Sequence, residues 1–179
     1  MALLHTIGHS THAIEDFLAL LGQHQIALLV DVRSYPSSKR WPQFDQEALR
    51  ESVEHAGVDY GWLKGLGGRR RLGSESINDG WEHSAFRAYA DYIAGAEGRA
   101  ALSELIELAS HKRIAIMCSE GLWWQCHRRI ISDYMTVRGC EVVHIMPDGK
   151  PVPHRLTPFA IECNGVIEYR ARSHDSRSQ

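Results

Sequence analysis

The chain has 179 residues, of which 44% are hydrophobic and 23% are charged, a composition typical of one globular domain with its own core. Its formal net charge of −2 disfavours nucleic acid as a partner and argues against an anionic membrane surface. No apolar run approaches the roughly 20 residues of a membrane span, no secretory signal is evident at the start, and the four cysteines lack the spacing of a disulfide framework. A reduced, cytoplasmic protein is therefore expected.

Short apolar runs alternate with helical patterns through the first half of the chain. Residues 3–7, 26–30 and 58–63 are predicted strands because they are short, apolar and rich in branched side chains. Helical spacing of apolar residues predicts one helix from Ile14 to Gly22 and another from Asp45 to Gly57. The segments between these elements, including the proline-containing residues 35–44, are predicted loops.

The second half begins with a polar, glycine-containing loop over residues 72–82. It continues with the predicted elements helix 86–93, helix 99–110, strand 114–117, a helix that ends at Gly139, and strand 141–145. The proline-containing segment that follows is expected to form one edge hairpin around Val166 and Ile167.

Strands that alternate with helices favour a mostly parallel sheet with helices on both faces, a three-layer α/β/α arrangement. We predict a single α/β domain over residues 1–172 and a polar C-terminal tail over residues 173–179. In such a sheet the carboxyl ends of the parallel strands share one edge, and ligands bind there. Polar segments follow the predicted strands repeatedly, at residues 8–10, 31–33, 65–71, 118–120 and after His144. This recurrence predicts one composite site.

Residues 113–133 carry the densest chemistry, because a strand ends at Cys118 and Glu120 and the next helix begins at His127 and Arg128. A thiol near a helix N-terminus and a guanidinium group is favoured as a thiolate, which would make Cys118 a nucleophile. The alternative is that Cys118 is a buried residue in the wall of the site, because unpaired cysteine is among the most buried residue types. A cation in the first turn of a helix opposes the helix dipole. Arg128 therefore implies an anion nearby, either a ligand or a buried carboxylate.

Several segments together resemble the bacterial and archaeal family catalogued as domain of unknown function 488. They are Thr6–Ser10, Leu29–Ser34 with Pro36, Phe44, Leu66–Gly68, Cys118–Glu120, Cys126–Arg128 and Val143–Ile145. The resemblance implies an α/β fold and candidate site residues, and no particular reaction. Where family members usually carry a charged, proline-containing linker, this chain has Gly-Leu-Trp-Trp-Gln at residues 121–125. A looser similarity to rhodanese-like domains is an analogy of fold only.

The leading functional prediction is a small enzyme for a phosphate-bearing or otherwise anionic substrate, with a nucleotide as one candidate, because arginines suit phosphate. The predicted catalytic residues are Cys118, Glu120, His127 and His9, and the predicted substrate-binding residues are Ser10, Asp31, Arg33, Arg128, Gly67 and Gly68. The first alternative is a non-enzymatic nucleotide or nucleic-acid binding module that uses Trp123 or Trp124. The second is a metal-binding protein that uses Cys and His, although their spacing is not that of a zinc site. No metal or cofactor is predicted, and the sequence does not define an oligomeric state.

Overall fold

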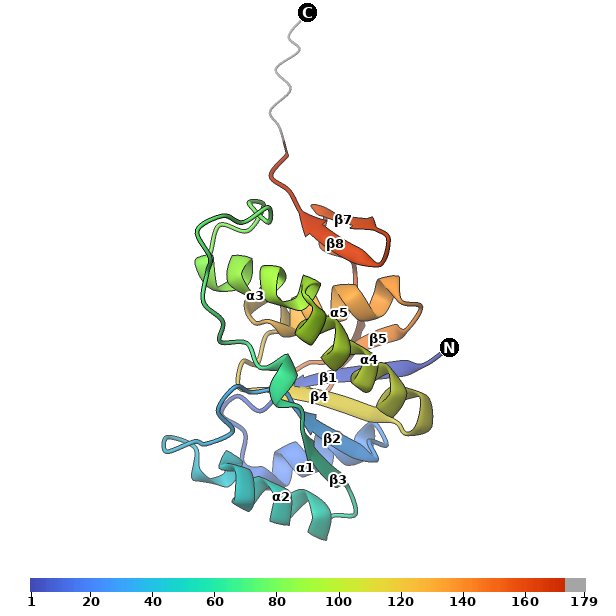
Figure 1. Ribbon diagram of the computed structural model, residues 1–179. Coiled ribbons are helices and arrows are strands. Elements are labelled where there is room, and N and C mark those ends of the chain that lie inside the picture. Colours follow the sequence, from blue (N-terminus) through green and yellow to red (C-terminus); the bar gives the residue numbers. More distant parts are fainter. Residues whose placement is uncertain (173–179) are drawn as a thin grey trace, which may run out of the picture.

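The computed structural model describes residues 1–172, which form a six-stranded sheet covered by helices and a separate two-stranded hairpin (Figure 1). The strands are β1 Leu3–Gly8, β2 Leu28–Asp31, β3 Asp59–Trp62, β4 Ile114–Cys118, β5 Glu141–Ile145, β6 Pro151–Pro153, β7 Ala160–Cys163 and β8 Val166–Tyr169. The α-helices are α1 Ile14–Gln23, α2 Gln46–His55, α3 Ser84–Ala94, α4 Ala96–His111 and α5 Arg128–Val137. Three short 3₁₀ helices, η1 Pro42–Phe44, η2 Lys64–Leu66 and η3 Trp123–Gln125, lie in the loops.

The main sheet has the strand order β3-β2-β4-β1-β5-β6. Its first five strands are parallel, and β6 is antiparallel to β5. The predicted α/β class with a mostly parallel sheet is therefore confirmed. The predicted tail, residues 173–179, lies outside the described residues.

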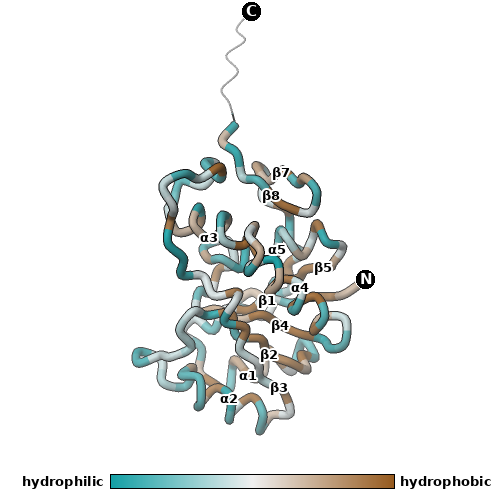
Figure 2. The backbone as a smooth tube through the Cα atoms, viewed as in Figure 1, coloured by the Kyte–Doolittle hydropathy of each residue, from teal (hydrophilic) through white to brown (hydrophobic). Residues whose placement is uncertain are grey.

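Two apolar cores lie on opposite faces of the sheet. On one face α1 and α2 bury Phe17, Leu21, Leu49 and Val53, and on the other face α3, α4 and α5 bury side chains such as Tyr89, Leu105 and Ile131. The central strand β4 contributes to both cores, because successive side chains point to opposite faces. The tube in Figure 2 accordingly changes from hydrophobic along the inner strands to hydrophilic on much of the outer helices and loops.

The C-terminal region differs from the predicted single edge hairpin. Residues 151–153 extend the main sheet as β6, with Val152 opposite His144. Prolines are tolerated there because an edge strand need not donate hydrogen bonds on its outer side. The β7–β8 hairpin forms its own sheet and packs Ile167 and Tyr169 against the core on the α3–α5 face. The C-terminal region thus forms an edge strand and a separate hairpin instead of one hairpin, because the packing of the folded chain determines which strands become neighbours.

Gly8, the last residue of β1, lets the loop after β4 cross closely over β1. A Cβ atom at Gly8 would lie 1.7 Å from the carbonyl oxygen of Glu120 and 2.5 Å from its carbonyl carbon. Backbone atoms cannot move away as the end of a flexible side chain can, so Gly8→Ala is expected to lower the free energy of unfolding by more than about 3 kcal/mol. Urea denaturation measures this difference.

Gly22→Ala is the matched control for that substitution, because a Cβ at Gly22 would meet no atom of the described residues within 4 Å beyond its chain neighbours and the backbone of helix α1. Alanine is favoured over glycine in a helix by up to about 1 kcal/mol, so this variant is expected to be at least as stable as the wild type. Equal stability of Gly8→Ala and the wild type would contradict the close crossing.

Candidate functional site

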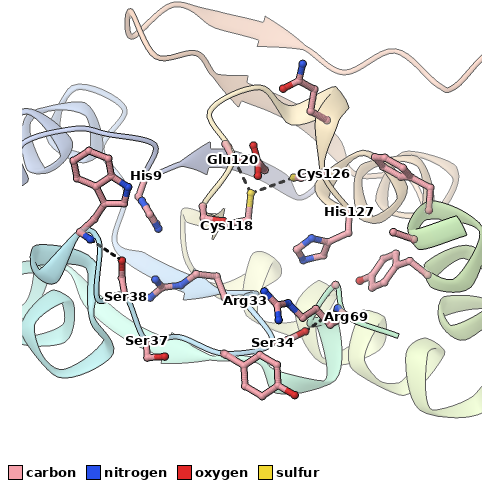
Figure 3. Close-up of a pocket in the computed structure, with 18 residues that line it drawn as sticks. His9, Arg33, Ser34, Ser37, Ser38, Arg69, Cys118, Glu120, Cys126 and His127 are labelled. Carbon is pink, nitrogen blue, oxygen red and sulfur yellow. Dashed lines mark hydrogen bonds between the residues drawn. The ribbon is translucent and has the colours of Figure 1, made fainter. Parts of the chain in front are cut away.

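The carboxyl ends of three neighbouring strands meet at one pocket of about 410 Å³. His9 follows β1, Arg33 and Ser34 follow β2, and Cys118 ends β4. Figure 3 shows Cys118, Glu120 and Cys126 on one side of this pocket and Arg33, Ser34 and Arg69 on the opposite side. Residues that lie more than eighty positions apart in the chain are thus brought together by the parallel topology.

The loop after β4 is held in place by an extension of the β1–β4 pairing. The backbone N–H of His9 donates to the carbonyl of Cys118 at 2.9 Å, and that of Ser10 donates to the carbonyl of Ser119 at 3.0 Å. The side chain of Ser10, a predicted substrate-binding residue, lies close to Gly121 and is absent from the pocket wall. These contacts fix the chain that leads from Cys118 to Cys126.

Two thiols face each other in the pocket wall, with 3.1 Å between Cys118 Sγ and Cys126 Sγ. Both side chains are buried, with 2% of Cys118 and 7% of Cys126 exposed. None of the four cysteines, all of which lie within residues 1–172, is in a disulfide bond. Cys126 was not among the predicted site residues, and a separation of eight positions offered no signal that the two sulfurs would touch.

Arg128, the first residue of α5, turns its guanidinium group into the molecule. Its Nε donates to Cys118 Sγ at 3.0 Å and to Cys126 Sγ at 3.2 Å. Its Nη1 donates to Thr6 Oγ1 at 3.1 Å, and its Nη2 donates to the carbonyl oxygen of Glu120 at 2.6 Å. The side chain is completely buried and does not line the pocket. The structure therefore does not place Arg128 where it would contact a ligand in the pocket.

The cation of Arg128 has no carboxylate partner among residues 1–172. A buried charge without an opposite charge is strongly unfavourable, and the two sulfur atoms are the ionisable groups in contact with the guanidinium. Burial by itself would raise the pKa of Cys126, but the hydrogen bond from Cys118, the charge of Arg128 and its backbone N–H lower that pKa to about 6. Burial and the neighbouring sulfur raise the pKa of Cys118. These effects favour the thiolate at Cys126 and the protonated thiol at Cys118, and Cys118 Sγ also lies 3.6 Å from the carbonyl oxygen of Glu120, a second acceptor for its proton.

One ring nitrogen of His127 is hydrogen-bonded to the backbone, and the other keeps a lone pair. Its Nε2 lies 2.8 Å from the carbonyl oxygen of Val32, and because a carbonyl only accepts hydrogen bonds, Nε2 carries the proton. Burial lowers the pKa of His127, so the ring is neutral at pH 7 and Nδ1 keeps its lone pair. His127 lines the pocket.

His9 is arranged in the same way with the nitrogens exchanged. Its Nδ1 donates to the carbonyl of Ser10 at 2.9 Å, and its ring stacks on Phe44 with 4.3 Å between the centroids. Burial lowers the pKa of His9 to about 4, so Nε2 is an acceptor at neutral pH. Two neutral histidines therefore lie in the wall of the pocket that contains the thiols.

Asp31 and Arg33 form a buried pair that shapes the loop beside the pocket. Both nitrogens Nε and Nη2 of Arg33 donate to the carboxylate of Asp31, at 2.8–3.2 Å, and the hydroxyl of Tyr60 donates to the same carboxylate at 2.7 Å. Arg33 also donates to the carbonyl of Phe44 at 2.8 Å. Arg33 borders the pocket and Asp31 does not, so most donors of this arginine already have protein partners.

Gly67 and Gly68 allow the loop after η2 to approach two other segments. A Cβ at Gly67 would lie 2.6 Å from Ser34 Oγ, and one at Gly68 would lie 2.6 Å from His127 Nδ1. Gly68 lines the pocket, whereas Gly67 does not. The close approach carries Arg69 to the pocket, where its backbone N–H donates to Ser34 Oγ at 2.8 Å.

The three consecutive arginines at residues 69–71 have different surroundings. The guanidinium group of Arg70 lies 3.6 Å from the ring centroid of Tyr92 and donates to the carbonyl of Gly67 at 3.2 Å. Arg71 is exposed and does not line the pocket, whereas Arg69 does. The side chain of Arg69 lies over the ring of Tyr35 and forms no ion pair within the described residues.

A second polar network, which the sequence did not predict, contacts Arg128 through the hydroxyl of Thr6. The hydroxyl of Thr6 accepts from Arg128 and forms a hydrogen bond of 2.7 Å with His144 Nδ1. His144 Nε2 is hydrogen-bonded to His154 Nδ1 at 2.9 Å, and His154 Nε2 donates to Asp133 at 2.8 Å. Every donor in this chain finds an acceptor, which makes such a buried network rigid.

Trp123 covers this network from the linker between Glu120 and Cys126. Its ring is parallel to that of His144 within 3°, with 4.1 Å between the centroids, and it meets His154 edge to face. The neighbouring Trp124 is 41% exposed. One of the two tryptophans thus packs against the histidines and the other faces solvent.

No three His, Cys, Asp or Glu side chains within residues 1–172 are grouped as ligands for a metal ion. Among the same residues, no helix combines the length and apolar character needed to cross a membrane.

Fold and site define an α/β protein with a pocket at the carboxyl edge of its sheet and a buried thiol pair bound to arginine. A model of the family described as Domain of unknown function DUF488 matches residues 13–135, and the chain belongs to this family. The match confirms the resemblance inferred from the sequence. No curated protein matches the chain, and no solved structure matches it.

Proposed function

We propose that this chain is a small enzyme that acts on a phosphate-bearing or otherwise anionic substrate, with Cys126 as its thiolate nucleophile. The observation that carries the proposal is the fully buried Arg128, which contacts two sulfurs and, among residues 1–172, no carboxylate. A thiolate is the reactive form of cysteine, and nucleophilic cysteines are activated by a neighbouring cation or a helix N-terminus. Cys126 has both, because it precedes α5 and accepts from the backbone N–H of Arg128 at 3.3 Å.

Charge recognition is assigned to Arg69 on the side of the pocket opposite Glu120 (Figure 3). Arg69 has no carboxylate partner in the part of the chain that the structure describes, and guanidinium groups bind phosphate oxygens in pairs. The hydroxyl groups of Ser34, Ser37 and Ser38 border the same space. The phosphate would bind on this side, which leaves the reacting atom of the substrate toward Cys126.

Proton transfer is assigned to three further groups that line the pocket, His127, His9 and Glu120. His127 Nδ1 and His9 Nε2 carry lone pairs at neutral pH, and the exposed carboxylate of Glu120 borders the pocket. Such groups accept or return a proton when they lie within hydrogen-bond reach of a substrate. Tyr35, Trp41 and Phe86 also line the pocket, and aromatic rings of this kind stack on bases, which favours a nucleotide as the substrate.

Inorganic phosphate is expected to protect Cys126 from iodoacetamide in the reduced protein. Iodoacetamide is uncharged, so protection reports on occupation of the pocket rather than on screening, and potassium chloride at equal ionic strength controls for salt. The Arg69→Gln variant is expected to need about tenfold more phosphate for half-protection, because a hydrogen bond to a charged group contributes about 1.5–3 kcal/mol. Labelled peptides counted by mass spectrometry measure the rate at each cysteine.

Arg71→Gln is the matched control, because Arg71 is exposed and does not line the pocket, and it should leave protection unchanged. Phosphate that binds by calorimetry yet leaves the labelling of Cys126 unchanged would favour a binding module over an enzyme. Labelling of Cys126 no faster than that of the exposed Cys163 would contradict the thiolate.

A further inference from the structure

We propose that Cys118 and Cys126 form a redox-active pair that a hydroperoxide oxidises to an intramolecular disulfide and that a dithiol reduces again. This activity goes beyond the proposed function, because it needs the two thiols and an oxidant and does not depend on an anionic substrate. The geometry that carries it is the distance of 3.1 Å between the two sulfur atoms.

The sulfur atoms need to move by only about 1 Å to reach the length of a disulfide bond, about 2.05 Å. Cys118 is the last residue of β4, and Cys126 directly follows η3 in the loop before α5. The connecting loop can absorb a shift of this size, whereas the strand is held by β1 and β2 on both sides. Formation of the bond therefore requires no rearrangement of the sheet.

Access to the pair is through the pocket, since both cysteines line it. Cys126 is the more exposed of the two, at 7% against 2% for Cys118. It also accepts two hydrogen bonds from Arg128, from the backbone N–H at 3.3 Å and from Nε at 3.2 Å. These donors favour its thiolate, so Cys126 attacks first and Cys118 follows.

The oxidation with hydrogen peroxide takes place in two steps. The Cys126 thiolate attacks one peroxide oxygen, so that a sulfur–oxygen bond forms, the oxygen–oxygen bond breaks and hydroxide leaves, which gives a sulfenic acid. Cys118 then attacks the sulfur of Cys126, so that the sulfur–sulfur bond forms and the sulfur–oxygen bond breaks. The departing hydroxide takes the thiol proton of Cys118 and becomes water. Two sulfurs are each oxidised by one electron, and both peroxide oxygens are reduced.

Arg128 makes this disulfide easy to reduce. In the reduced protein the guanidinium group is balanced by the thiolate, and in the disulfide both sulfurs are neutral while Arg128 stays buried. An environment that stabilises the reduced thiolate favours reduction of the disulfide. The pair would therefore switch reversibly, and oxidation would remove the thiolate on which the proposed reaction depends.

The test oxidises the reduced wild-type protein under native conditions with a small excess of hydrogen peroxide. Remaining thiols are then alkylated in denaturant, and the digest is analysed by mass spectrometry. We expect a peptide pair linked through Cys118 and Cys126, alkylated Cys140 and Cys163, and loss of the link after dithiothreitol. The same result should be obtained with Cys163→Ser, which excludes a bond between two molecules through the exposed thiol.

Single variants then assign the order of attack. In Cys118→Ser, dimedone should trap a sulfenic acid on Cys126, because no second thiol is within reach. In Cys126→Ser, Cys118 should resist the same peroxide concentration. The proposal is overturned by irreversible oxidation of Cys126 with Cys118 still free, or by links that join other cysteines. Neither outcome bears on phosphate protection of Cys126, so the proposed function fails or stands by its own measurement.

Discussion

Replacement of Arg128 by methionine is expected to raise the pKa of Cys126 from about 6 to the ordinary value of a free thiol, about 8.5, or higher. The methionine side chain has no charge and no hydrogen-bond donor. The sulfur of Cys126 therefore stays buried, which raises its pKa, and loses the interactions with Arg128 that lower its pKa. The fold is expected to lose roughly 3–5 kcal/mol, the range for removing one partner of a buried charge pair. Thr6 and the carbonyl of Glu120 lose their donors in the same change.

The midpoint of the pH profile for iodoacetamide labelling of Cys126 measures the first effect. A rate at one pH is a poor measure, because a thiolate of higher pKa is also a stronger nucleophile. Urea denaturation at neutral pH measures the second effect. Together they separate the electrostatic role of Arg128 from its structural role.

Arg129→Met is the neighbouring control. Arg129 lies over the ring of Trp81 and donates to Thr157 at 3.0 Å, so the labelling midpoint should not change. Arg128→Lys keeps a cation and should fall between the wild type and Arg128→Met, which preserves the test if methionine prevents folding. A midpoint that stays near 6 in a folded Arg128→Met variant would show that the cation does not stabilise the thiolate.

Acidification from pH 7 to pH 4 is expected to lower the free energy of unfolding by an amount comparable with its whole value at pH 7. Burial lowers the pKa of His5 and of His9 to about 4 and that of His144 to about 2. Each is buried and neutral in the folded state, whereas the unfolded chain binds protons below about pH 6.5. Because the unfolded state binds more protons, acid favours unfolding.

The size of this effect follows from about 1.4 kcal/mol per pKa unit, which gives roughly 2–3 kcal/mol for each histidine by pH 4. Three such groups approach the stability of a typical domain, about 5–15 kcal/mol. The loss should begin below about pH 6.5 and continue toward pH 4. The lowered pKa of Cys126 affects the free energy of unfolding in a different pH range. The Cys126 thiolate stabilises the folded state fully above the thiol pKa of the unfolded chain, about 8.5, and this stabilisation is lost as the pH falls toward about 6.

Urea denaturation at a series of pH values tests the histidine effect. His5→Leu removes one buried titrating group, whose Nδ1 has no hydrogen-bond partner within residues 1–172, and should make the acid dependence shallower. His55→Gln is the control, because His55 is exposed at the end of α2, and should leave the dependence unchanged. A stability that is constant from pH 7 to pH 4 would contradict the neutral state of these buried histidines.

The sequence by itself determined the sheet and the edge at which the pocket lies. Apolar runs such as residues 114–117 are short and are followed by polar residues. Parallel strands joined by helices must bring their carboxyl ends to one edge of the sheet. The segments around His9, Arg33 and Cys118 could therefore be placed together before the structure was known. The family resemblance also rested on residues that the sequence presents directly.

Only the tertiary structure decided which of these side chains face the pocket. Arg69 and Arg128 are both arginines near the same edge, yet the first borders the pocket and the second is buried beneath it. The direction of a side chain at a helix N-terminus depends on how that helix packs against the sheet, which residue types do not encode. The same holds for the contact of Cys126 with Cys118 and for the chain of hydrogen bonds from Thr6 to Asp133. These pairings are made through space between residues that are not neighbours in the sequence, so their distances, and the pKa values that depend on them, exist only in the folded protein.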